Sequence, residues 1–417
     1  MDTAIVLYGP PASGKDTVTA ALVDRDQRFR HYQRMKVGAG RTAGYRMISP
    51  AEFEQLTSAG EIIYSNSRYG STYIIDRPEL AKSLAARQVP VIHVGQLEAV
   101  DALLAAAPNT RWVVTELWCP REIAAERIDA RNTGDTAERL EAWEATPRLA
   151  TADVRIDTAL IDPVAAAGQI IEAVDAARCT VVVPAMHLVQ PDGTLDMVAT
   201  QLYASAAATS WVDYFLINGS TASGNELPHS QRTSVLDAWL EAVGPNRLLA
   251  CAWSTNDIAA AAERRVTPMA VLKAGSRPEA QRFLRTLPAG SMIYSHPEFG
   301  HRFDAELARW AKDSGCLPVA GKISKISLTE ITEIQRVAPE FAIWDGSSRR
   351  IRKSISAGAG GIVAMPLAAR LTDLPPRSLS LIQPIVDALR KELDQLPDRA
   401  AKRRWLLDQI QKPWAGP

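Results

Sequence analysis

Short apolar runs recur at regular intervals through the C-terminal part of the chain, and amphipathic stretches separate them. An alternation of strand-like and helical patterns predicts parallel β-strands joined by crossover helices. The C-terminal part is therefore expected to be an α/β domain. The runs are Val181–Ala185, Tyr214–Ile217, Leu248–Trp253, Met269–Leu272, Met292–Tyr294, Leu317–Ala320, Phe341–Trp344 and Ile362–Met365.

Eight strand–helix units within roughly 240 residues favour a (β/α)₈ TIM barrel, for which about 250 residues is typical. A doubly wound open sheet is the main alternative, but the number of units favours the barrel. Two further helical patterns, Leu381–Leu396 and Ala400–Gln411, are expected to finish the chain.

The pattern changes near Ala176, and the part before it has a different organisation. A buried strand, Ala4–Tyr8, leads into a glycine-rich turn and then a helix that ends near Val23. Residues 170–177 are expected to form the last helix of this part, because Thr180 opens a new apolar run. We therefore predict two α/β domains, residues 1–177 and 178–417, with a very short connection.

Composition and charge exclude several classes of protein. The chain has 417 residues, in which 47 Lys and Arg balance 47 Asp and Glu. This balance offers no general attraction for nucleic acid or a membrane surface, so small molecules are the expected partners. No segment resembles a signal peptide or a membrane span. Four widely spaced cysteines without a CxxC pair indicate reduced thiols in a cytoplasmic protein.

The glycine-rich turn after the first strand has the pattern of a phosphate-binding loop. Strand, turn and helix in this order let backbone N–H groups and a helix N-terminus surround phosphate oxygens. The pattern predicts ATP as ligand, with Lys15 acting on the β- and γ-phosphates. Asp16 replaces the usual hydroxyl residue, so Thr17 is the candidate ligand of Mg²⁺, and an ordinary glycine turn is the alternative. The candidate ATP-binding residues are Gly9, Pro10, Pro11, Ala12, Ser13, Gly14, Lys15, Asp16 and Thr17.

Residues 1 to about 175 resemble the guanylate kinase-like branch of the P-loop kinases. The segment Gly60–Ile63, followed by Tyr69-Gly70-Ser71, resembles the acceptor-binding segment of that branch, and residues 127–140 resemble its lid. The resemblance implies a P-loop kinase domain, built as a parallel sheet with helices on both faces. It also implies that Arg127 and Arg131 close over ATP and that Arg139 and Tyr69 contact the acceptor.

The chain departs from guanylate kinases at the positions that recognise guanine. That family has a glutamate where Tyr64 stands and an aspartate near Val94. Without these carboxylates, the donor-rich edge of guanine lacks acceptors. The Gly-Lys-Asp-Thr form is closer to ribose 1,5-bisphosphate phosphokinase, which makes phosphoribosyl diphosphate. A set of basic residues, including Arg41, is available to bind an acceptor phosphate, and a solvated basic face is equally ordinary.

Three features of the predicted barrel fall at strand ends, where active sites of such barrels lie. Lys322 is expected to follow the sixth strand, Tyr294 ends the fifth, and Ser220-Thr221 follow the second. A buried lysine that is uncharged can attack a carbonyl to form a Schiff base, and a tyrosine can relay protons. The Ser-Thr turn offers donors for a keto-acid carboxylate. Lys325 is a rival nucleophile, expected on the following helix or loop.

This constellation resembles the dihydrodipicolinate synthase/N-acetylneuraminate lyase family over residues 180–370. The resemblance rests on Gly219-Ser220-Thr221, on Tyr294 with Pro297, and on Gly321-Lys322. It implies a Schiff base on Lys322 with no organic prosthetic group. Phe299 stands where the synthase branch has a carboxylate-binding arginine, so a different aldol or lyase reaction is expected. His296 is a further candidate for substrate binding.

The leading hypothesis is a bifunctional enzyme with the phosphotransferase and the Schiff-base aldolase or lyase on one chain. Its kinase substrate is expected to be ribose 1,5-bisphosphate, and its barrel substrate pyruvate or another 2-oxo acid. The alternative is a guanylate or nucleoside monophosphate kinase whose non-catalytic barrel serves oligomerisation. A third hypothesis is a sensor that binds ATP without turnover. In each case a homo-oligomer formed through the barrel is expected.

Overall fold

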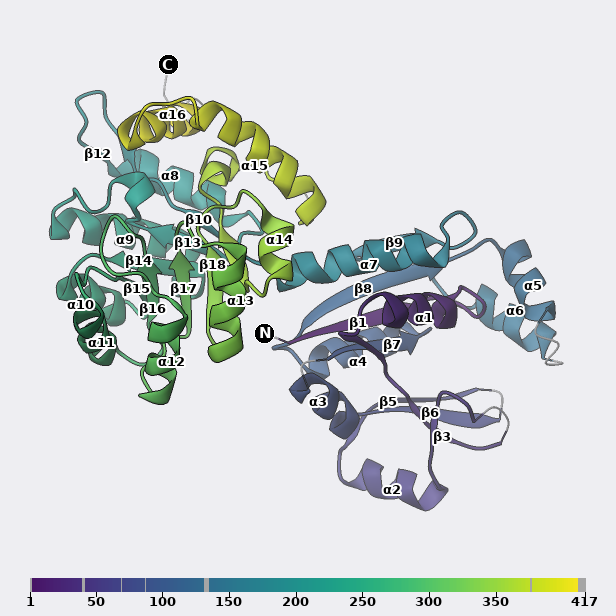
Figure 1. Cartoon of the computed structure of the whole chain (residues 1–417). Helices are drawn as coiled ribbons and strands as arrows, with labels where there is room; N and C mark the ends of the chain where they lie inside the picture. The colour runs from purple at the N-terminus through teal and green to yellow at the C-terminus, as the bar shows by residue number, and fades with distance from the viewer. Residues whose placement is uncertain are drawn as a thin grey trace. The chain divides into compact units, whose positions relative to one another are not determined.

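The computed structural model describes residues 2–39, 42–68, 70–86, 88–130, 135–375 and 377–411. The chain divides into two compact units, Met1–Arg178 and Cys179–Pro417 (Figure 1). Each unit has its own sheet and its own hydrophobic core.

The N-terminal unit is built on a parallel five-stranded sheet with the order β2-β7-β1-β8-β9. The central position of β1 places the glycine-rich turn that follows it at the middle of the carboxyl edge of the sheet. The strands are β1 (Thr3–Tyr8), β2 (Phe29–His31), β7 (Val89–Val94), β8 (Arg111–Trp118) and β9 (Val154–Asp157).

Helices cover both faces of this sheet, as predicted. Ile5 and Leu7 pack into a core cluster with residues of α1 (Lys15–Arg25) and α7 (Pro163–Arg178). Val6 and Tyr8 pack into a second cluster with residues of α3 (Arg77–Ala85) and α4 (Leu97–Ala106). This alternation along one fully buried strand is the pattern that a sheet covered on both sides requires.

A second, small sheet of the N-terminal unit has the order β4-β3-β6-β5 and is mainly antiparallel. Its strands are β3 (Met35–Val37), β4 (Arg46–Met47), β5 (Ile62–Arg68) and β6 (Ser71–Asp76). The remaining helices of the unit are α2 (Pro50–Ser58), α5 (Arg121–Asp129) and α6 (Thr136–Glu144). Sequence patterns did not predict this sheet, in which β3 and β4 are only three and two residues long and β5 is only partly buried.

The C-terminal unit is a closed barrel of eight parallel strands, which confirms the predicted (β/α)₈ architecture. In barrel order the strands are β10 (Thr180–Pro184), β13 (Tyr214–Ile217), β14 (Leu248–Ala252), β15 (Thr267–Val271), β16 (Met292–Ser295), β17 (Ala320–Ile323), β18 (Ala342–Asp345) and β19 (Gly361–Val363).

The sixth barrel strand differs from its prediction. The apolar run Leu317–Ala320 was expected to be the strand and Lys322 to follow it, but β17 spans Ala320–Ile323 and contains Lys322. Pro318 has no N–H to donate to a neighbouring strand, and β17 begins two residues after it.

Nine helices in the described part of the barrel unit follow or finish the strands. They are α8 (Met197–Ala208), α9 (His229–Val243), α10 (Thr255–Glu263), α11 (Arg277–Thr286), α12 (Ala305–Asp313), α13 (Leu328–Val337), α14 (Ile351–Ser356), α15 (Leu379–Leu393) and α16 (Arg399–Gln411). A hairpin of β11 (Leu188–Val189) and β12 (Leu195–Asp196) follows β10, and short 3₁₀ helices are η1 (Ser220–Ala222), η2 (Pro245–Arg247) and η3 (Met365–Arg370).

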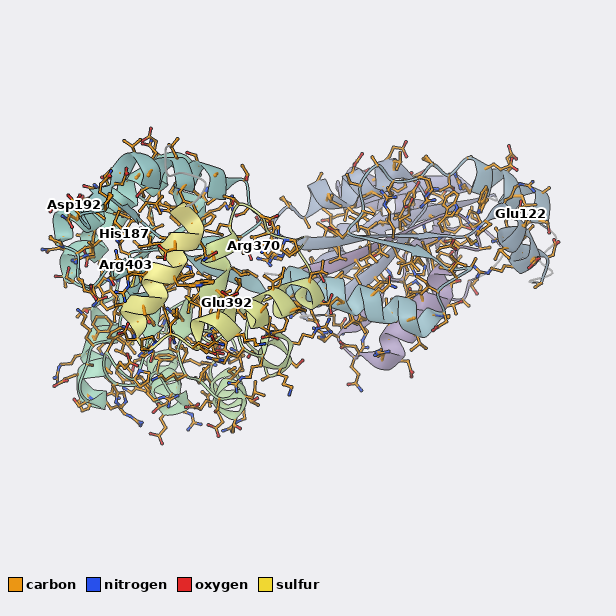
Figure 2. The ribbon with its side chains drawn as sticks, turned by 90° about the horizontal axis from the view of Figure 1, so that it is seen from above. Glu122, His187, Asp192, Arg370, Glu392 and Arg403 are labelled. Atoms are coloured by element: carbon orange, nitrogen blue, oxygen red, sulfur yellow. The ribbon has the colours of Figure 1, made fainter. Side chains whose placement is uncertain are left out.

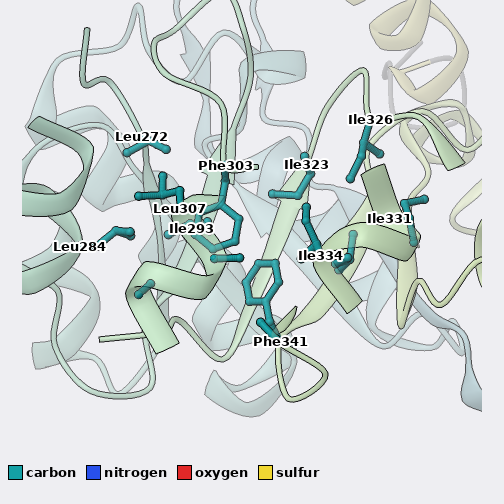
Figure 3. Packing of buried hydrophobic residues seen from close by; sticks show 14 of the residues in the cluster. Leu272, Leu284, Ile293, Phe303, Leu307, Ile323, Ile326, Ile331, Ile334 and Phe341 are labelled. Carbon is teal, nitrogen blue, oxygen red and sulfur yellow. The ribbon is translucent and has the colours of Figure 1, made fainter. Parts of the chain in front are cut away.

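The strands of the barrel divide their side chains between two cores. Ile293 and Ile323 lie in the outer core with side chains of α12 and α13, among them Leu307 (Figure 3). Tyr294 and Ala320 lie in the inner core, which fills the barrel. Because side chains alternate along a strand, Lys322 points to the same inner side as Ala320.

All four cysteines are thiols; three are buried and Cys316 is half-buried. In the part of the chain that the structure describes, no helix is both long and apolar enough to cross a membrane.

Candidate active sites of the two units

The glycine-rich turn of the N-terminal unit folds into a tight loop around Lys15. Gly14 has φ of 87° and Ala12 has φ of 58°, so the loop turns through left-handed conformations. A Cβ atom on Gly9 would lie 2.2 Å from the carbonyl oxygen of Leu117, so only glycine fits against β8. Lys15 Nζ donates to the carbonyl oxygens of Gly9 (2.7 Å) and Pro10 (2.8 Å). The lysine therefore lies across the loop at the start of α1.

The loop opens onto a cavity of about 920 Å³. Gly9, Pro11, Ala12, Ser13, Gly14, Lys15 and Asp16 line one side of it. The small sheet and its connections contribute Arg34, Lys36, Tyr45, Asn66, Arg68 and Tyr73. Asp135, Glu138 and Arg139, at the start of α6, complete another part of the lining. These three segments are far apart in the sequence and meet at one cavity only in the folded unit.

The side of the cavity formed by the small sheet is basic and aromatic. The Arg34 guanidinium lies 5.9 Å from the ring centroid of Tyr45 and 5.2 Å from that of Tyr73. Lys36 Nζ lies 5.8 and 5.7 Å from the same centroids and donates to the carbonyl oxygen of Ala39 at 2.5 Å. No described residue on this side of the cavity lining carries a carboxylate. This side is therefore suited to an anionic group.

The structure separates Asp16 from Thr17, the predicted ligand of Mg²⁺. Asp16 lines the cavity, and its Oδ1 lies 3.5 Å from His93 Nδ1. Thr17 is exposed and is not part of the described lining. One residue along the first turn of a helix rotates a side chain by about 100°, which moves Thr17 away from the loop. Of these two residues, Asp16 is the one that lines the cavity.

Arg127 and Arg139 have different positions relative to the loop. Arg127 donates to the carbonyl oxygen of Ala12 (3.2 Å), and to Oγ1 (2.9 Å) and the carbonyl oxygen (2.7 Å) of Thr158. Arg127 therefore stabilises the loop through the backbone of Ala12. Arg139 lines the cavity, where Asp135 Oδ1 accepts from its Nε at 2.7 Å. The predicted residues Arg41, Tyr69 and Arg131 lie outside the described residues.

The barrel site begins with Lys322 and Tyr294, which are register partners on β17 and β16. Lys322 Nζ lies 4.0 Å from the centroid of the Tyr294 ring, and the residues are 6% and 1% exposed. The Tyr294 hydroxyl and Ser220 Oγ form a hydrogen bond of 3.0 Å. These contacts bring together an amine, a phenol and an alcohol from three strand ends.

The connection after β13 holds Ser220 in place. Asn218 has φ of 57°, and its carbonyl oxygen accepts from Trp253 Nε1 at 2.8 Å. A Cβ atom on Gly224 would lie 2.0 Å from that carbonyl oxygen, so the chain folds closely back on itself. Thr221, the second residue of the predicted carboxylate-binding turn, lines a pocket of about 210 Å³ together with Ser220.

Aromatic rings form one wall beside this site. The ring of Phe299 meets those of Tyr294 and Trp253 edge to face, with centroids 5.7 and 5.1 Å apart. His296 packs against the rings of Tyr294 and Phe299, and burial lowers its pKa to about 4. His296 Nδ1 accepts from the backbone N–H of Glu298 at 3.1 Å, so the proton of the neutral ring lies on Nε2.

The rival lysine and the neighbouring arginine lie away from this cluster. Lys325 is exposed and pairs with Glu298 at 3.1 Å. Arg302 pairs with Glu330 at 2.8 Å and so does not take the place of the absent arginine at Phe299. Sequence reasoning missed Cys251, a thiol of the inner core whose pKa burial raises to about 12. It predicted the last helix, at 400–411, but did not connect the basic residues Arg399, Lys402 and Arg403 of α16 with the barrel site.

No family model matches the chain, and no curated protein matches it. Several solved structures are similar to its C-terminal part. A dihydrodipicolinate synthase from Agrobacterium tumefaciens is 18% identical, with a TM-score of 0.48, 57% of this chain and 91% of that chain covered. A prophage protein of the dihydrodipicolinic acid synthase family from E. coli K12, solved in complex with pyruvate, is 16% identical (TM-score 0.47, 56% and 87% covered). A 2-keto 3-deoxygluconate aldolase from Picrophilus torridus is 16% identical (TM-score 0.47, 55% and 93% covered).

Proposed function

We propose that the barrel unit is a Schiff-base aldolase or lyase that acts on pyruvate or another 2-oxo acid. The observation that carries the proposal is the chain of contacts from Lys322 through Tyr294 to Ser220. A buried amine in contact with a proton donor, which itself contacts a second hydroxyl, has the parts that imine formation needs.

The chemistry follows from these three side chains. The amine of Lys322 attacks the C2 carbonyl carbon: the N–C bond forms as the C=O π bond breaks, and one N–H proton moves to the oxygen to give a carbinolamine. The Tyr294 hydroxyl, hydrogen-bonded to Ser220, delivers a proton to the carbinolamine oxygen, which leaves as water. In a substrate with a C4 hydroxyl, the protonated imine takes up the electron pair of the C3–C4 bond as that bond breaks and becomes an enamine, while the tyrosinate accepts the C4 hydroxyl proton and the fragment leaves as an aldehyde. The same steps in reverse form the bond. Ser220 and Thr221 hold the carboxylate of the substrate.

Borohydride trapping tests this proposal directly. The full chain is incubated with pyruvate and a panel of other 2-oxo acids, reduced, digested and analysed by mass spectrometry. We expect a reduced adduct at Lys322 that Lys322→Met abolishes and Lys325→Met leaves in place. Absence of an adduct at Lys322 with every acid of the panel would overturn the proposal and favour a non-catalytic barrel.

We propose that the N-terminal unit transfers the γ-phosphoryl group of Mg·ATP to a small phosphorylated acceptor. The supporting observation is one cavity shared by the Lys15 loop and the basic, aromatic side of Arg34 and Lys36. Backbone N–H groups at the start of α1 and Lys15 suit the phosphates of a nucleotide. The absence of carboxylates from the described lining of the basic side suits an anionic acceptor better than guanine. Ribose 1,5-bisphosphate is the acceptor we favour.

The residues present fit the requirements of Mg·ATP. Asp16 is a carboxylate at the loop, and Mg²⁺ is typically held by one or two such groups together with phosphates and water. When bound, the ion neutralises charge on the β- and γ-phosphates. An acceptor oxygen attacks the γ-phosphorus in line, the bond from the γ-phosphorus to the β–γ bridging oxygen breaks, and ADP leaves. Lys15 and Arg139 stabilise the charge that the transferred group spreads over its oxygens.

The kinase proposal is tested by product analysis with Mg·ATP and an acceptor panel of GMP, dGMP, other nucleoside monophosphates and ribose 1,5-bisphosphate. Phosphoribosyl diphosphate as the dominant product is expected. GDP as the dominant product would overturn the choice of acceptor and support the nucleotide-kinase alternative. ATP binding without any transfer would leave only a nucleotide sensor.

We also propose that the chain forms a homo-oligomer through the barrel unit. Val198 and Leu202, one turn apart on α8, are 72% and 53% exposed. Large apolar side chains gathered on a surface are typical of an interface. Light scattering of the wild type and of the double variant Val198→Lys/Leu202→Lys tests this: the variant is expected to have a lower mass, and a monomeric wild type would contradict the proposal.

A further inference from the structure

The last helix of the chain, α16, lies at the carboxyl end of the barrel. It contacts η1, which follows β13, and η3, which follows β19. In Figures 1 and 2, α16 covers that end of the barrel unit. Arg399, its first residue, pairs with Glu298 at 2.7 Å in the connection after β16. The helix therefore reaches connections on two sides of the barrel opening.

Beneath α16 lies the pocket of about 210 Å³ that Ser220 and Thr221 line. Lys402 and Arg403 of α16 line the same pocket. Ser220 also forms the hydrogen bond with the Tyr294 hydroxyl, so the pocket shares a residue with the Lys322 site. A group bound in this pocket would be held within reach of a substrate attached to Lys322.

Arg403 lies in unusual surroundings for a guanidinium. Its Nη2 is 2.8 Å from Nε2 of His187, a side chain that is 1% exposed, and Figure 2 shows the two residues next to each other. Burial lowers the pKa of His187 to about 4, so this partner is neutral. Arg403 Nε and His187 Nδ1 are buried, and neither has a hydrogen-bond partner within the described part of the chain. The guanidinium is thus partly desolvated without a paired carboxylate.

The acidic groups near the pocket have other partners. Asp398 itself lines the pocket, and its Oδ1 accepts from the backbone N–H of Ala401 and so caps the helix. Glu298 binds both Lys325 and Arg399. Glu226 is exposed and acts on Arg403 only through space. The backbone N–H of Lys402 donates to the carbonyl oxygen of Asp398 at 3.2 Å, but its side-chain ammonium has no hydrogen bond or ion pair to another described residue. Lys402 and Arg403 therefore leave positive charge at a pocket that also presents two hydroxyls.

We infer that Lys402 and Arg403, with Ser220 and Thr221, form a binding site for an oxyanion of the barrel substrate, either its carboxylate or a phosphate ester. The inference rests on the proposed Schiff-base function and adds a specificity site to it. A charged hydrogen-bond donor on a helix that covers the opening gives the barrel a preference for acidic substrates. It also makes the C-terminal helix part of the active site.

Borohydride trapping at Lys322 in the whole chain measures how strongly this site binds the oxo acid. The concentration of pyruvate that gives half-maximal borohydride adduct is compared with that of a 2-oxo acid bearing a terminal phosphate ester. We expect Lys402→Gln and Arg403→Gln each to raise this concentration by about tenfold, as the loss of one charged hydrogen bond predicts, and Arg403→Lys to restore part of the loss. Arg404→Gln, an exposed neighbour outside the pocket, is the matched control and is expected to have no effect.

The two substrates identify the oxyanion. A loss with pyruvate itself supports the carboxylate as the bound group, and a loss confined to the phosphorylated acid supports the phosphate ester. Equal half-saturation in Lys402→Gln, Arg403→Gln and Arg404→Gln with both acids overturns the inference. Lys402→Gln keeps the test valid if Arg403→Gln disturbs folding through His187.

A second measurement separates the failure of this inference from the failure of the proposed function. Binding of radiolabelled inorganic phosphate is measured by equilibrium dialysis on a Lys15→Met background, which weakens the loop of the N-terminal unit. Phosphate binding that Lys402→Gln reduces and Arg404→Gln does not supports the anion site even if no oxo acid forms an adduct. Phosphate binding that is the same in both variants, with no effect on trapping, overturns it.

Discussion

Lys322 Nζ rests on the face of the Tyr294 ring, 4.0 Å from its centroid, and the two residues are register partners in adjacent barrel strands. The contact uses the ring, whereas the hydroxyl of the same tyrosine is directed to Ser220 at 3.0 Å. Tyr294 therefore makes two separable contacts, one through its ring with the amine and one through its hydroxyl, which we propose to be the proton donor.

Tyr294→Phe should separate these roles. The variant keeps the ring against Lys322 but removes the hydroxyl, so we expect imine formation to slow by roughly 10²-fold or more with little change in half-saturation. Ser220→Ala should instead raise the half-saturating concentration of the oxo acid, because it removes a donor to the carboxylate. Rates of borohydride trapping over a concentration series distinguish the two effects. Identical behaviour of both variants would contradict this division of roles.

Asp16 and Thr17 can be compared in the same way. Asp16→Asn should lower the rate of phosphoryl transfer and raise the Mg²⁺ concentration required, because it removes the carboxylate that lines the cavity. Thr17→Val should change both quantities little, since Thr17 is exposed and outside the described lining. Initial rates across a Mg²⁺ titration provide the measurement. A larger effect from Thr17→Val would restore the hydroxyl as the metal ligand.

Two adjacent glycines of the barrel are expected to differ in how well they tolerate replacement by alanine. A Cβ atom on Gly361 would lie 2.3 Å from the carbonyl oxygen of Thr180 in the neighbouring strand, whereas on Gly360 its nearest contact would be 3.5 Å, to Ala342. Gly361→Ala should therefore lower the free energy of unfolding of the barrel unit by about 1–3 kcal/mol. Gly360→Ala should change it by less than about 1 kcal/mol. Urea unfolding curves of both variants test this, and equal midpoints would refute it.

His187 predicts a loss of stability in mild acid. Its pKa is about 4 in the folded protein, mainly because of burial and secondly because of Arg403, against an ordinary value of 6.5. Above pH 6.5 the ring is neutral in both states. Between pH 6.5 and 4 the unfolded chain binds more protons, so stability falls as the pH falls, by up to roughly 3 kcal/mol. His187→Gln should flatten this part of the profile; urea midpoints at pH 7 and pH 4.5 provide the comparison, and an unchanged slope would count against it.

The barrel strands were predictable because each is a short apolar run bounded by helical patterns. Seven of the eight runs cover more than half of the strand observed at their position, and Tyr214–Ile217 is identical to β13. The run Leu317–Ala320 overlaps β17 only at Ala320, because hydrophobicity alone does not fix where a strand begins and ends. The small sheet of the N-terminal unit was not predictable, because β3 and β4 are only three and two residues long and are paired by distant segments.

The candidate sites likewise contain some residues that the sequence could indicate and others that it could not. Local patterns were enough to propose Lys15, Lys322 and Tyr294 as candidates. A glycine-rich loop between a strand and a helix, or a lysine at a strand end, can be recognised from a few consecutive residues. They were not enough to choose between Asp16 and Thr17, since that choice depends on which side of the first helical turn faces the cavity. They also gave no reason to connect Arg403 with Ser220, which lie far apart in the sequence and line one pocket.

The sequence by itself determined the α/β class, the eight-unit barrel and the residue types available for chemistry, because hydrophobic periodicity and glycine-rich turns are local properties of the chain. Only the tertiary structure decided which side chains meet. The pairing of β16 with β17 made Lys322 and Tyr294 neighbours, and the small sheet brought Arg34 and Lys36 to the cavity of Lys15. The packing of α16 placed Lys402 and Arg403 at the pocket that Ser220 lines. Such contacts depend on how separate elements pack, and no short stretch of sequence encodes that.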